Sequence, residues 1–130
     1  MLMETRFNTK KWIITFSILL FLVIAICILS FRPIISPKED DCSKIAGILS
    51  KYRYLDKSND LQIKLKNDTK VYYINNIQKA CVDSLMMDTL KGKMIIIYAV
   101  NHWTLLDPKS KFKHVARLTT INNKILYTEY

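Results

Sequence analysis

The feature that most constrains this chain is the apolar stretch from Trp12 to Phe31, WIITFSILLFLVIAICILSF, which contains no charged side chain. A helix rises ~1.5 Å per residue, so a helix of this length spans about 30 Å, the thickness of the hydrocarbon core of a bilayer. A helix also pairs all of its own backbone polar groups, as a lipid environment requires. The sequence therefore predicts one transmembrane helix over residues 12–31.

This stretch does not fit a cleaved signal peptide. The apolar core of a secretory signal is shorter, ~7–15 residues, and small residues precede its cleavage site. Here the apolar run continues past Cys27 to Phe31, and Ile26 occupies the position where a lipoprotein signal has a small residue. We therefore expect the helix to remain on the protein as a membrane anchor.

Basic residues around the span give the expected orientation. Three basic residues precede the span, and two follow it before a run of acidic residues. Positive charge is retained on the cytoplasmic side of a membrane. We therefore expect a cytoplasmic tail over residues 1–11 and place residues 32–130 outside the cytoplasm. The residues expected at the two membrane interfaces are Lys10, Lys11, Trp12, Phe31 and Arg32.

The segment after the span has the composition of a linker. Residues 32–41, RPIISPKEDD, contain two prolines, which favour extended backbone. At ~3.1 Å per residue this linker reaches about 30 Å, so the domain that follows is held close to the membrane. Residues 42–130 suffice for one small domain. The net charge of the chain, +9, can attract anionic lipids or an acidic partner, although scattered lysines also protect strand edges.

Two cysteines in the domain, Cys42 and Cys81, form a candidate disulfide. An even number of cysteines outside the cytoplasm favours a bridge, which would stabilise the domain by closing a long loop. Two buried free thiols are the alternative, and the spacing of the cysteines does not choose between the two.

The hydrophobic pattern of the domain switches between strand and helix periods. The segment LQIKLK over residues 61–66 alternates apolar and polar side chains, which is typical of a half-buried strand. The β-branched run over residues 94–100 favours a strand that is buried on both faces. Apolar residues at helical spacing follow Asn75 or Asn76, either of which can cap a helix that ends at Gly92. The expected strands are 42–55, 61–66, 71–74, 94–100, 115–121 and 124–130.

The resulting order, β-β-β-α-β-β with the last strand folded into a hairpin, resembles the OB-fold. In that fold five strands close into a small barrel, and a helix lies between the third and fourth strands. Gly47 inside the first strand predicts a bulge or sharp bend, which suits closure. The predicted fold class is a single N-terminal transmembrane helix plus a small, mainly-β, OB-like barrel domain. An SH3-like barrel and an open α+β sheet are the alternatives.

Four short strings carry a second resemblance. These strings are YYIN at residues 72–75, WTLLDP at 103–108, KH at 113–114 and ILYTE at 125–129. They are similar to those of a group of uncharacterised small bacterial proteins with one N-terminal anchor. The resemblance implies a bacterial membrane protein and nothing catalytic. The expected location is the inner (cytoplasmic) membrane, with the N-terminus in the cytoplasm.

No motif marks a catalytic or cofactor-binding site. His102, Asp107 and His114 are residue types that bind metal, so a small metal-dependent enzyme is an alternative, but they lack tight ligand spacing. The domain also lacks a glycine-rich phosphate loop. Tyrosines interspersed with lysines suit a lipid- or nucleic-acid-binding domain, although an extracytoplasmic position argues against nucleic acid. We expect no enzymatic activity, no cofactor and no metal.

The longest predicted loop, residues 101–113 (NHWTLLDPKSKFK), is the expected recognition element. Trp103 has two interpretations: it plugs one end of the barrel, or it is an exposed anchor for a partner. The predicted function is a non-enzymatic, membrane-anchored module that binds another envelope protein or a glycan, with an immunity or assembly role. The candidate binding surface consists of His102, Trp103, Asp107, Lys109, Lys111 and His114.

Overall fold

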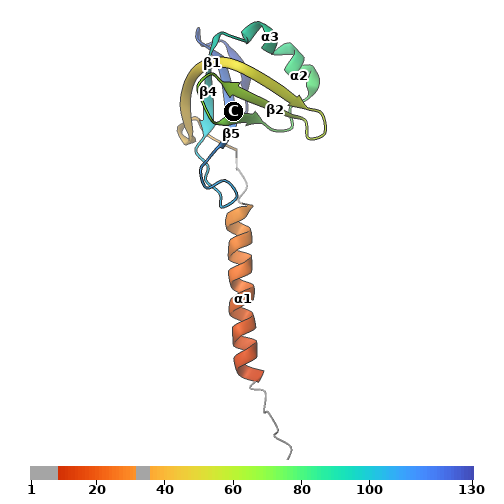
Figure 1. The fold of residues 1–130 in the computed structure, drawn as a ribbon, viewed down its shortest axis with the longest axis vertical. Coiled ribbons are helices and arrows are strands. Elements are labelled where there is room, and N and C mark those ends of the chain that lie inside the picture. The colour runs from red at the N-terminus through yellow and green to blue at the C-terminus, as the bar shows by residue number, and fades with distance from the viewer. Residues whose placement is uncertain (1–8, 32–35) are drawn as a thin grey trace, which may run out of the picture. The chain divides into compact units, whose positions relative to one another are not determined.

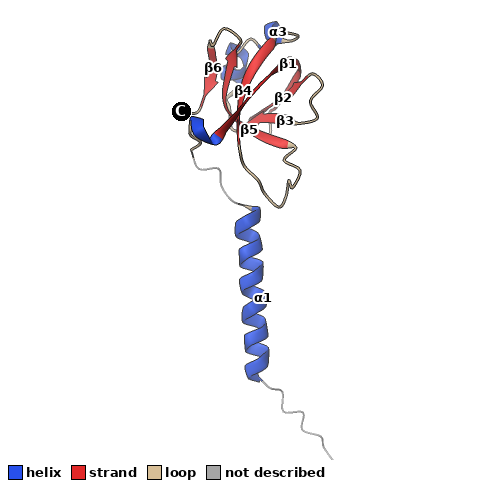
Figure 2. Cartoon of the chain, turned by 90° about the vertical axis from the view of Figure 1, so that its left-hand side faces the viewer, coloured by secondary structure: helices blue, strands red, loops and turns tan. Residues whose placement is uncertain are grey.

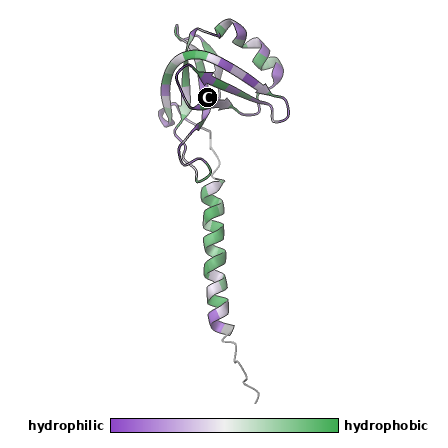
Figure 3. Ribbon diagram, viewed as in Figure 1, coloured by the Kyte–Doolittle hydropathy of each residue, from purple (hydrophilic) through white to green (hydrophobic). Residues whose placement is uncertain are grey.

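The computed structural model describes residues 9–31 and 36–130 of the chain. Most of the expected cytoplasmic tail, part of the linker and the expected interface residue Arg32 lie outside these ranges. The N-terminal helix, α1, extends over Thr9–Ser30. It is apolar along almost its whole length (Figure 3) and is long and apolar enough to cross a membrane. Lys10 and Lys11 lie in its first turn, and the Thr15 hydroxyl donates a hydrogen bond to the Lys11 carbonyl.

The expected aromatic residues lie at the two ends of α1. Trp12 is 63% exposed near the start of the helix, and Phe31 is 75% exposed directly after its last residue. A helix with so many exposed apolar side chains is stable only where lipid or another protein covers them. The described part of α1 therefore has the apolar surface that is typical of a membrane span.

Residues 36–130 form a mainly antiparallel β domain (Figures 1 and 2). Its strands are β1 (Cys42–Leu55), β2 (Asp60–Leu65), β3 (Val71–Ile74), β4 (Met94–Val100), β5 (Phe112–Thr120) and β6 (Ile125–Thr128). A short 3₁₀ helix over Glu39–Asp41 precedes β1. The strands are paired in the order β3-β2-β1-β4-β5-β6, and β3 also pairs with β5 in parallel.

The first strand exchanges partners along its length. Residues 42–48 pair with β4, whereas residues 49–55 pair with β2. The register shift falls between Leu49 and Lys51, not at Gly47 where the sequence predicts a bulge. Gly47 instead allows close packing, because a Cβ at this position would lie 2.7 Å from Leu65 Cδ1. Its role is to let β1 approach the Leu65 side chain closely.

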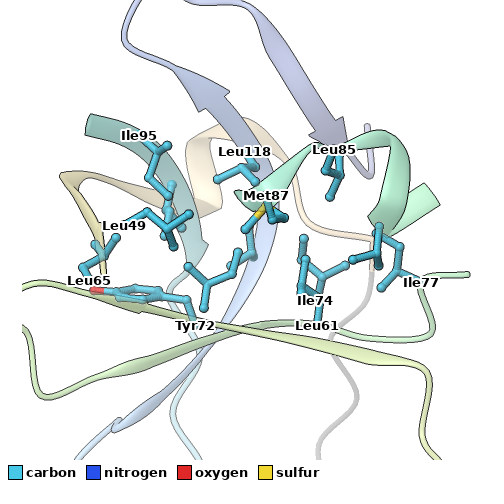
Figure 4. Close-up of a cluster of buried hydrophobic side chains, with 14 of the residues drawn as sticks. Leu49, Leu61, Leu65, Tyr72, Ile74, Ile77, Leu85, Met87, Ile95 and Leu118 are labelled. Carbon is cyan, nitrogen blue, oxygen red and sulfur yellow. The ribbon is translucent and has the colours of Figure 1, made fainter. Parts of the chain in front are cut away.

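The hydrophobic core lies between the sheet and the segment that connects β3 to β4 (Figure 4). β4 supplies Ile95 and Ile97 to this core, both fully buried, and Ile96 on the opposite side is only 7% exposed. The prediction that this strand is buried on both faces is confirmed. The labelled core residues from other elements are Leu49, Leu61, Leu65, Tyr72, Ile74, Ile77, Leu85, Met87 and Leu118.

The predicted single helix is two short helices, α2 (Lys79–Ser84) and α3 (Met87–Leu90). Met86 separates them in a left-handed conformation, with φ 50°. The predicted cap at Asn75 or Asn76 is wrong, because Gln78 precedes the first helical residue. Asn76 N–H donates to Asp60 Oδ1, so the start of this connection is bonded to β2 rather than to the helix.

The fifth strand begins three residues earlier than the sequence predicts. Its first residues pair with β3, in the register Val71–Phe112 and Tyr73–His114. Its later residues pair with β4 on one side and β6 on the other. The earlier start shortens the predicted loop, which extends over residues 101–111 and is called the 101–111 loop below.

Candidate functional site

The 101–111 loop begins where the linker meets the domain. Asn101 N–H donates a hydrogen bond of 3.0 Å to the Asp41 carbonyl, and Cys42 pairs with Val100 at the end of β4. Ser43 Oγ also donates to the Asn101 side-chain oxygen. The base of the loop is therefore joined to the residues that connect the domain to α1.

Asp107 has a structural role in this loop. Its carboxylate accepts hydrogen bonds from the backbone N–H groups of Lys111 (2.9 Å) and Phe112 (2.8 Å). The bond from Phe112 is the main reason that the pKa of Asp107 lies below its ordinary value. The Asp107 side chain thus holds the end of the loop against the start of β5.

The tip of the loop presents apolar side chains outward. Trp103 is 52% exposed, so the interpretation that it plugs the domain is wrong. Leu105 is 43% exposed and Leu106 is 70% exposed. Lys109 and Lys111 are exposed in the same loop. The loop therefore presents an aromatic ring and aliphatic side chains together with positive charge.

His114 is buried and does not belong to this exposed surface. It is 7% exposed, and its Nε2 lies 2.8 Å from Glu129 Oε2. The Tyr127 hydroxyl donates to the other Glu129 oxygen at 2.9 Å, and the Tyr73 and His114 ring centroids lie 5.5 Å apart. This cluster attaches the segment after β6 to β5 and β3, which is a structural role.

The structure does not gather the proposed metal ligands. Within residues 9–31 and 36–130, no three His, Cys, Asp or Glu side chains are grouped so that they could hold a metal ion. His102 is half-buried, and its backbone N–H donates to the Val100 carbonyl. His102, Asp107 and His114 therefore do not form such a group. Of the six residues of the predicted binding surface, the exposed ones are Trp103, Lys109 and Lys111.

A second surface, not predicted from the sequence, lies on the outer side of β1, β2 and β3. Arg53 pairs with Gln62, and Gln62 pairs with Tyr73 across the three strands. Residues directly opposite each other share one face of a sheet. In the next row Lys51 lies opposite Lys64. We call this surface the basic face, and it consists of Lys51, Arg53, Gln62, Lys64 and Tyr73.

The charges of the basic face are not neutralised. Like charges directly opposite each other destabilise a sheet, yet Lys51 and Lys64 are opposite and both exposed. Among the described residues the ion pairs are His114–Glu129 and Arg117–Glu39, so no ion pair involves this surface. A surface hollow of about 370 Å³ is lined by Lys51, Tyr52, Arg53, Gln62 and Lys64.

Tyr73 adds an aromatic hydrogen-bond donor to the basic face. Burial, and then the negative charges of Asp107 and Asp60, raise the pKa of Tyr73, so its phenol stays protonated at neutral pH. Cationic side chains, an amide and a phenol are groups that bind carboxylate, sulfate or phosphate oxygens. The basic face is therefore chemically suited to an anionic ligand.

Arg117, by contrast, has partners within the domain. Its Nη1 lies 3.3 Å from Glu39 Oε2, and its guanidinium carbon lies 4.4 Å from the Tyr130 ring centroid. The same carbon lies 5.4 Å from the ring centroid of Tyr98. These contacts join the segment before β1 to β4, β5 and the C-terminal residues. Arg117 thus has an ionic partner and two aromatic partners within the domain. Among the described residues, neither ion pair involves Lys51, Arg53 or Lys64 of the basic face.

Of the two alternatives for Cys42 and Cys81, the structure has two free cysteines and not the candidate disulfide. Cys42 begins β1, where its Sγ donates to the Lys38 carbonyl, and burial raises the pKa of its thiol. Cys81 is exposed on α2, which lines a pocket together with Tyr52 and Tyr54 near the other end of β1. The two cysteines therefore lie beside opposite ends of the longest strand.

The alternation of residues 61–65 already places Gln62 and Lys64 on the polar side of a strand. Their neighbours across β1 depend on the pairing register, which the sequence does not contain. Comparisons of the chain with protein-family models, curated proteins and solved structures find no match.

Proposed function

We propose that this chain is a non-enzymatic, membrane-anchored binding module of the bacterial envelope. In this proposal α1 crosses the inner membrane with its N-terminus in the cytoplasm, and the β domain lies outside the cytoplasm. The excess of basic residues before the span supports the orientation. An export-dependent reporter fused after Tyr130 is expected to be active, and activity of only a cytoplasmic reporter would contradict this orientation.

The β domain is further proposed to be an OB-like barrel. Its pairings support this fold, because β1 pairs with β2, β2 with β3, β3 with β5, β5 with β4, and β4 with β1. The segment that contains α2 and α3 lies between the third and fourth strands, as the helix does in an OB-fold.

The proposed ligand is an acidic envelope protein or an acidic glycan, bound at the basic face. The observation that carries this proposal is the exposed Lys51–Lys64 pair, placed in register beside Arg53 without an ion pair. A folded domain loses stability by keeping like charges opposite each other, and an anionic ligand offsets that repulsion. Outside the cytoplasm, protein and glycan are the abundant acidic polymers, so nucleic acid is not part of the proposal.

The test is capture of the partner from native membranes by crosslinking to the full-length chain. The double variant Lys51→Glu/Lys64→Glu is expected to reduce capture on the order of ten-fold, the equivalent of ~1.4 kcal/mol. The matched control is Lys91→Glu/Lys93→Glu, which reverses two exposed lysines between α3 and β4. Capture that is equal in the two variants would refute the assignment of the basic face. Protease or glycosidase treatment of the captured material identifies its class.

A further inference from the structure

The 101–111 loop presents exposed apolar side chains, and its base is bonded to the end of the linker. Trp103 is 52% exposed, Leu105 is 43% exposed and Leu106 is 70% exposed, so apolar side chains that are close together in the chain all face outward. Such neighbouring apolar side chains in a soluble domain mark a surface that something else covers. The partner that covers the loop must therefore be apolar and must lie near the end of the linker.

The fold holds the base of this loop at the end of the linker. Asn101 N–H bonds to the Asp41 carbonyl, and Asp41 is the last residue before β1. Ten residues, 32–41, connect the apolar span to that point. A chain extends at most ~3.6 Å per residue, so the base of the loop stays within about 36 Å of the end of the span. The loop is thus tethered within reach of the bilayer surface.

The chemistry of the loop matches a membrane interface. Tryptophan is enriched at the level of the lipid head groups, because its ring is apolar and its N–H is a hydrogen-bond donor. Lys109 and Lys111 are exposed in the same loop and carry the charge that anionic head groups attract. The carboxylate of Asp107, the acidic group of the loop, accepts two backbone N–H bonds, one from Lys111 in the loop and one from Phe112 at the start of β5.

We infer that the 101–111 loop docks on the bilayer that α1 spans, with Trp103 among the lipid head groups and Lys109 and Lys111 on their phosphates. This contact sets the orientation of the β domain on the membrane and leaves the basic face for its ligand. The inference rests on the part of the proposed function in which α1 is a membrane span.

The test uses the full-length chain in proteoliposomes, with Trp12→Phe to leave Trp103 as the single tryptophan. Vesicles are made of phosphatidylcholine with and without phosphatidylglycerol, and a fraction of the acyl chains is brominated. Bromine quenches tryptophan fluorescence inside the bilayer, whereas acrylamide quenches it in water. We expect Trp103 to be quenched by brominated lipid and protected from acrylamide, with stronger quenching in the anionic vesicles.

The control places a tryptophan on the same tethered domain but away from the linker. It is Trp12→Phe/Trp103→Phe/Lys57→Trp, since Lys57 is exposed in the turn after β1, at the end of that strand opposite to Cys42. The control is expected to show acrylamide quenching without bromine quenching. A further variant, Lys109→Gln/Lys111→Gln in the Trp12→Phe background, is expected to lose the additional quenching that anionic lipid produces.

Three results would overturn the inference, and flotation of the vesicles distinguishes a failure of the loop contact from a failure of the anchor. If the protein floats with the vesicles but Trp103 is quenched by acrylamide and not by bromine, the loop does not contact lipid and faces water or a protein partner. If the protein does not float, α1 does not insert, and the proposed anchoring fails as well. Equal bromine quenching of Trp103 and of the Lys57→Trp control would also overturn the inference, since it would show no contact specific to the loop.

Discussion

The chain contains two long apolar stretches, α1 and β4, and the structure treats them in opposite ways. The large apolar side chains of α1 are between 47% and 74% exposed. In β4, by contrast, Ile95 and Ile97 are fully buried and Ile96 is 7% exposed. The same residue types are therefore covered by the protein interior in β4 and left exposed in α1, which is long and apolar enough to span a membrane.

The difference provides a criterion for other apolar side chains of the chain. Those that pack within the domain have almost no exposed surface, as Leu61 and Leu118 do at 0%. Trp103 and Leu106 have exposures within or close to the range seen in α1. In its surface the 101–111 loop therefore resembles α1 rather than β4, as do Ile121 and Ile125 at 57% and 54%. The lipid contact inferred for the loop rests in addition on the bond of its base to the linker and on its two exposed lysines.

The largest expected difference between α1 and β4 is the change in the free energy of unfolding when an isoleucine side chain is truncated to alanine. Ile97→Ala is expected to lower the free energy of unfolding of the β domain by ~2–5 kcal/mol, because it leaves a cavity in the core. Ile18→Ala in α1, where the side chain is 63% exposed, is expected to change it by less than ~0.5 kcal/mol. Denaturant unfolding of both full-length variants in detergent measures the two effects. Equal losses would show that α1 packs as part of the domain.

A second substitution tests how tightly the core of the β domain is packed. Gly47→Ala adds a methyl group that meets Leu65 Cδ1 at 2.7 Å, and Leu65 is itself buried. We expect a loss of ~1–3 kcal/mol, as for other overpacked cores. The neighbouring control Ala46→Ser, at an exposed position, is expected to stay within ~0.5 kcal/mol. A neutral Gly47→Ala would mean that Leu65 moves freely and that the core is loosely packed.

A third test concerns a polar group at the edge of the core. The Tyr72 hydroxyl donates to Asp68 Oδ2 at 2.6 Å, and Lys70 N–H donates to Oδ1 at 2.9 Å. Although burial acts to raise the pKa of Asp68, these hydrogen bonds hold it below its ordinary value. Tyr72→Phe is expected to cost about 1 kcal/mol at neutral pH.

The pH dependence of this effect follows from the sign of the shift. A carboxyl whose pKa is lowered by folding stabilises the fold above its unfolded pKa of about 4, and the contribution disappears as the pH falls through the lower, folded value. The stability difference between wild type and Tyr72→Phe should therefore narrow below about pH 4. Thermal melts from neutral to acidic pH measure it, and a difference that widens on acidification would contradict the lowered pKa of Asp68.

The smallest expected effect is that of Trp103→Ala on folding. Since the indole is 52% exposed, the substitution should change the free energy of unfolding by less than ~0.5 kcal/mol. A loss of several kcal/mol, comparable to that of Ile97→Ala, would show that Trp103 is packed in the core as Ile97 is. It would also remove the basis for the inferred lipid contact. The same denaturant unfolding that reports on Ile97→Ala measures this variant.

Local patterns accounted for much of the fold. A charge-free run of membrane length, strict alternation over residues 61–65 and a β-branched run over residues 94–100 each depend on neighbours in the sequence, and the structure has a helix or a strand in each place. The break at Met86 was not predictable in this way, because apolar spacing is the same for one helix and for two short ones. The start of the connection depends on the bond from Asn76 to Asp60 in another strand.

The sequence by itself therefore determined the apolar helix, the identity of most strands and the surplus of positive charge. Only the tertiary structure decided that Lys51 lies opposite Lys64, that Cys42 and Cys81 lie beside opposite ends of β1, and that Trp103 is exposed. The physical reason is the range of the interactions involved. Helix and strand periods are set by residues a few positions apart, whereas strand register and exposure are set by contacts between residues that are distant in the chain.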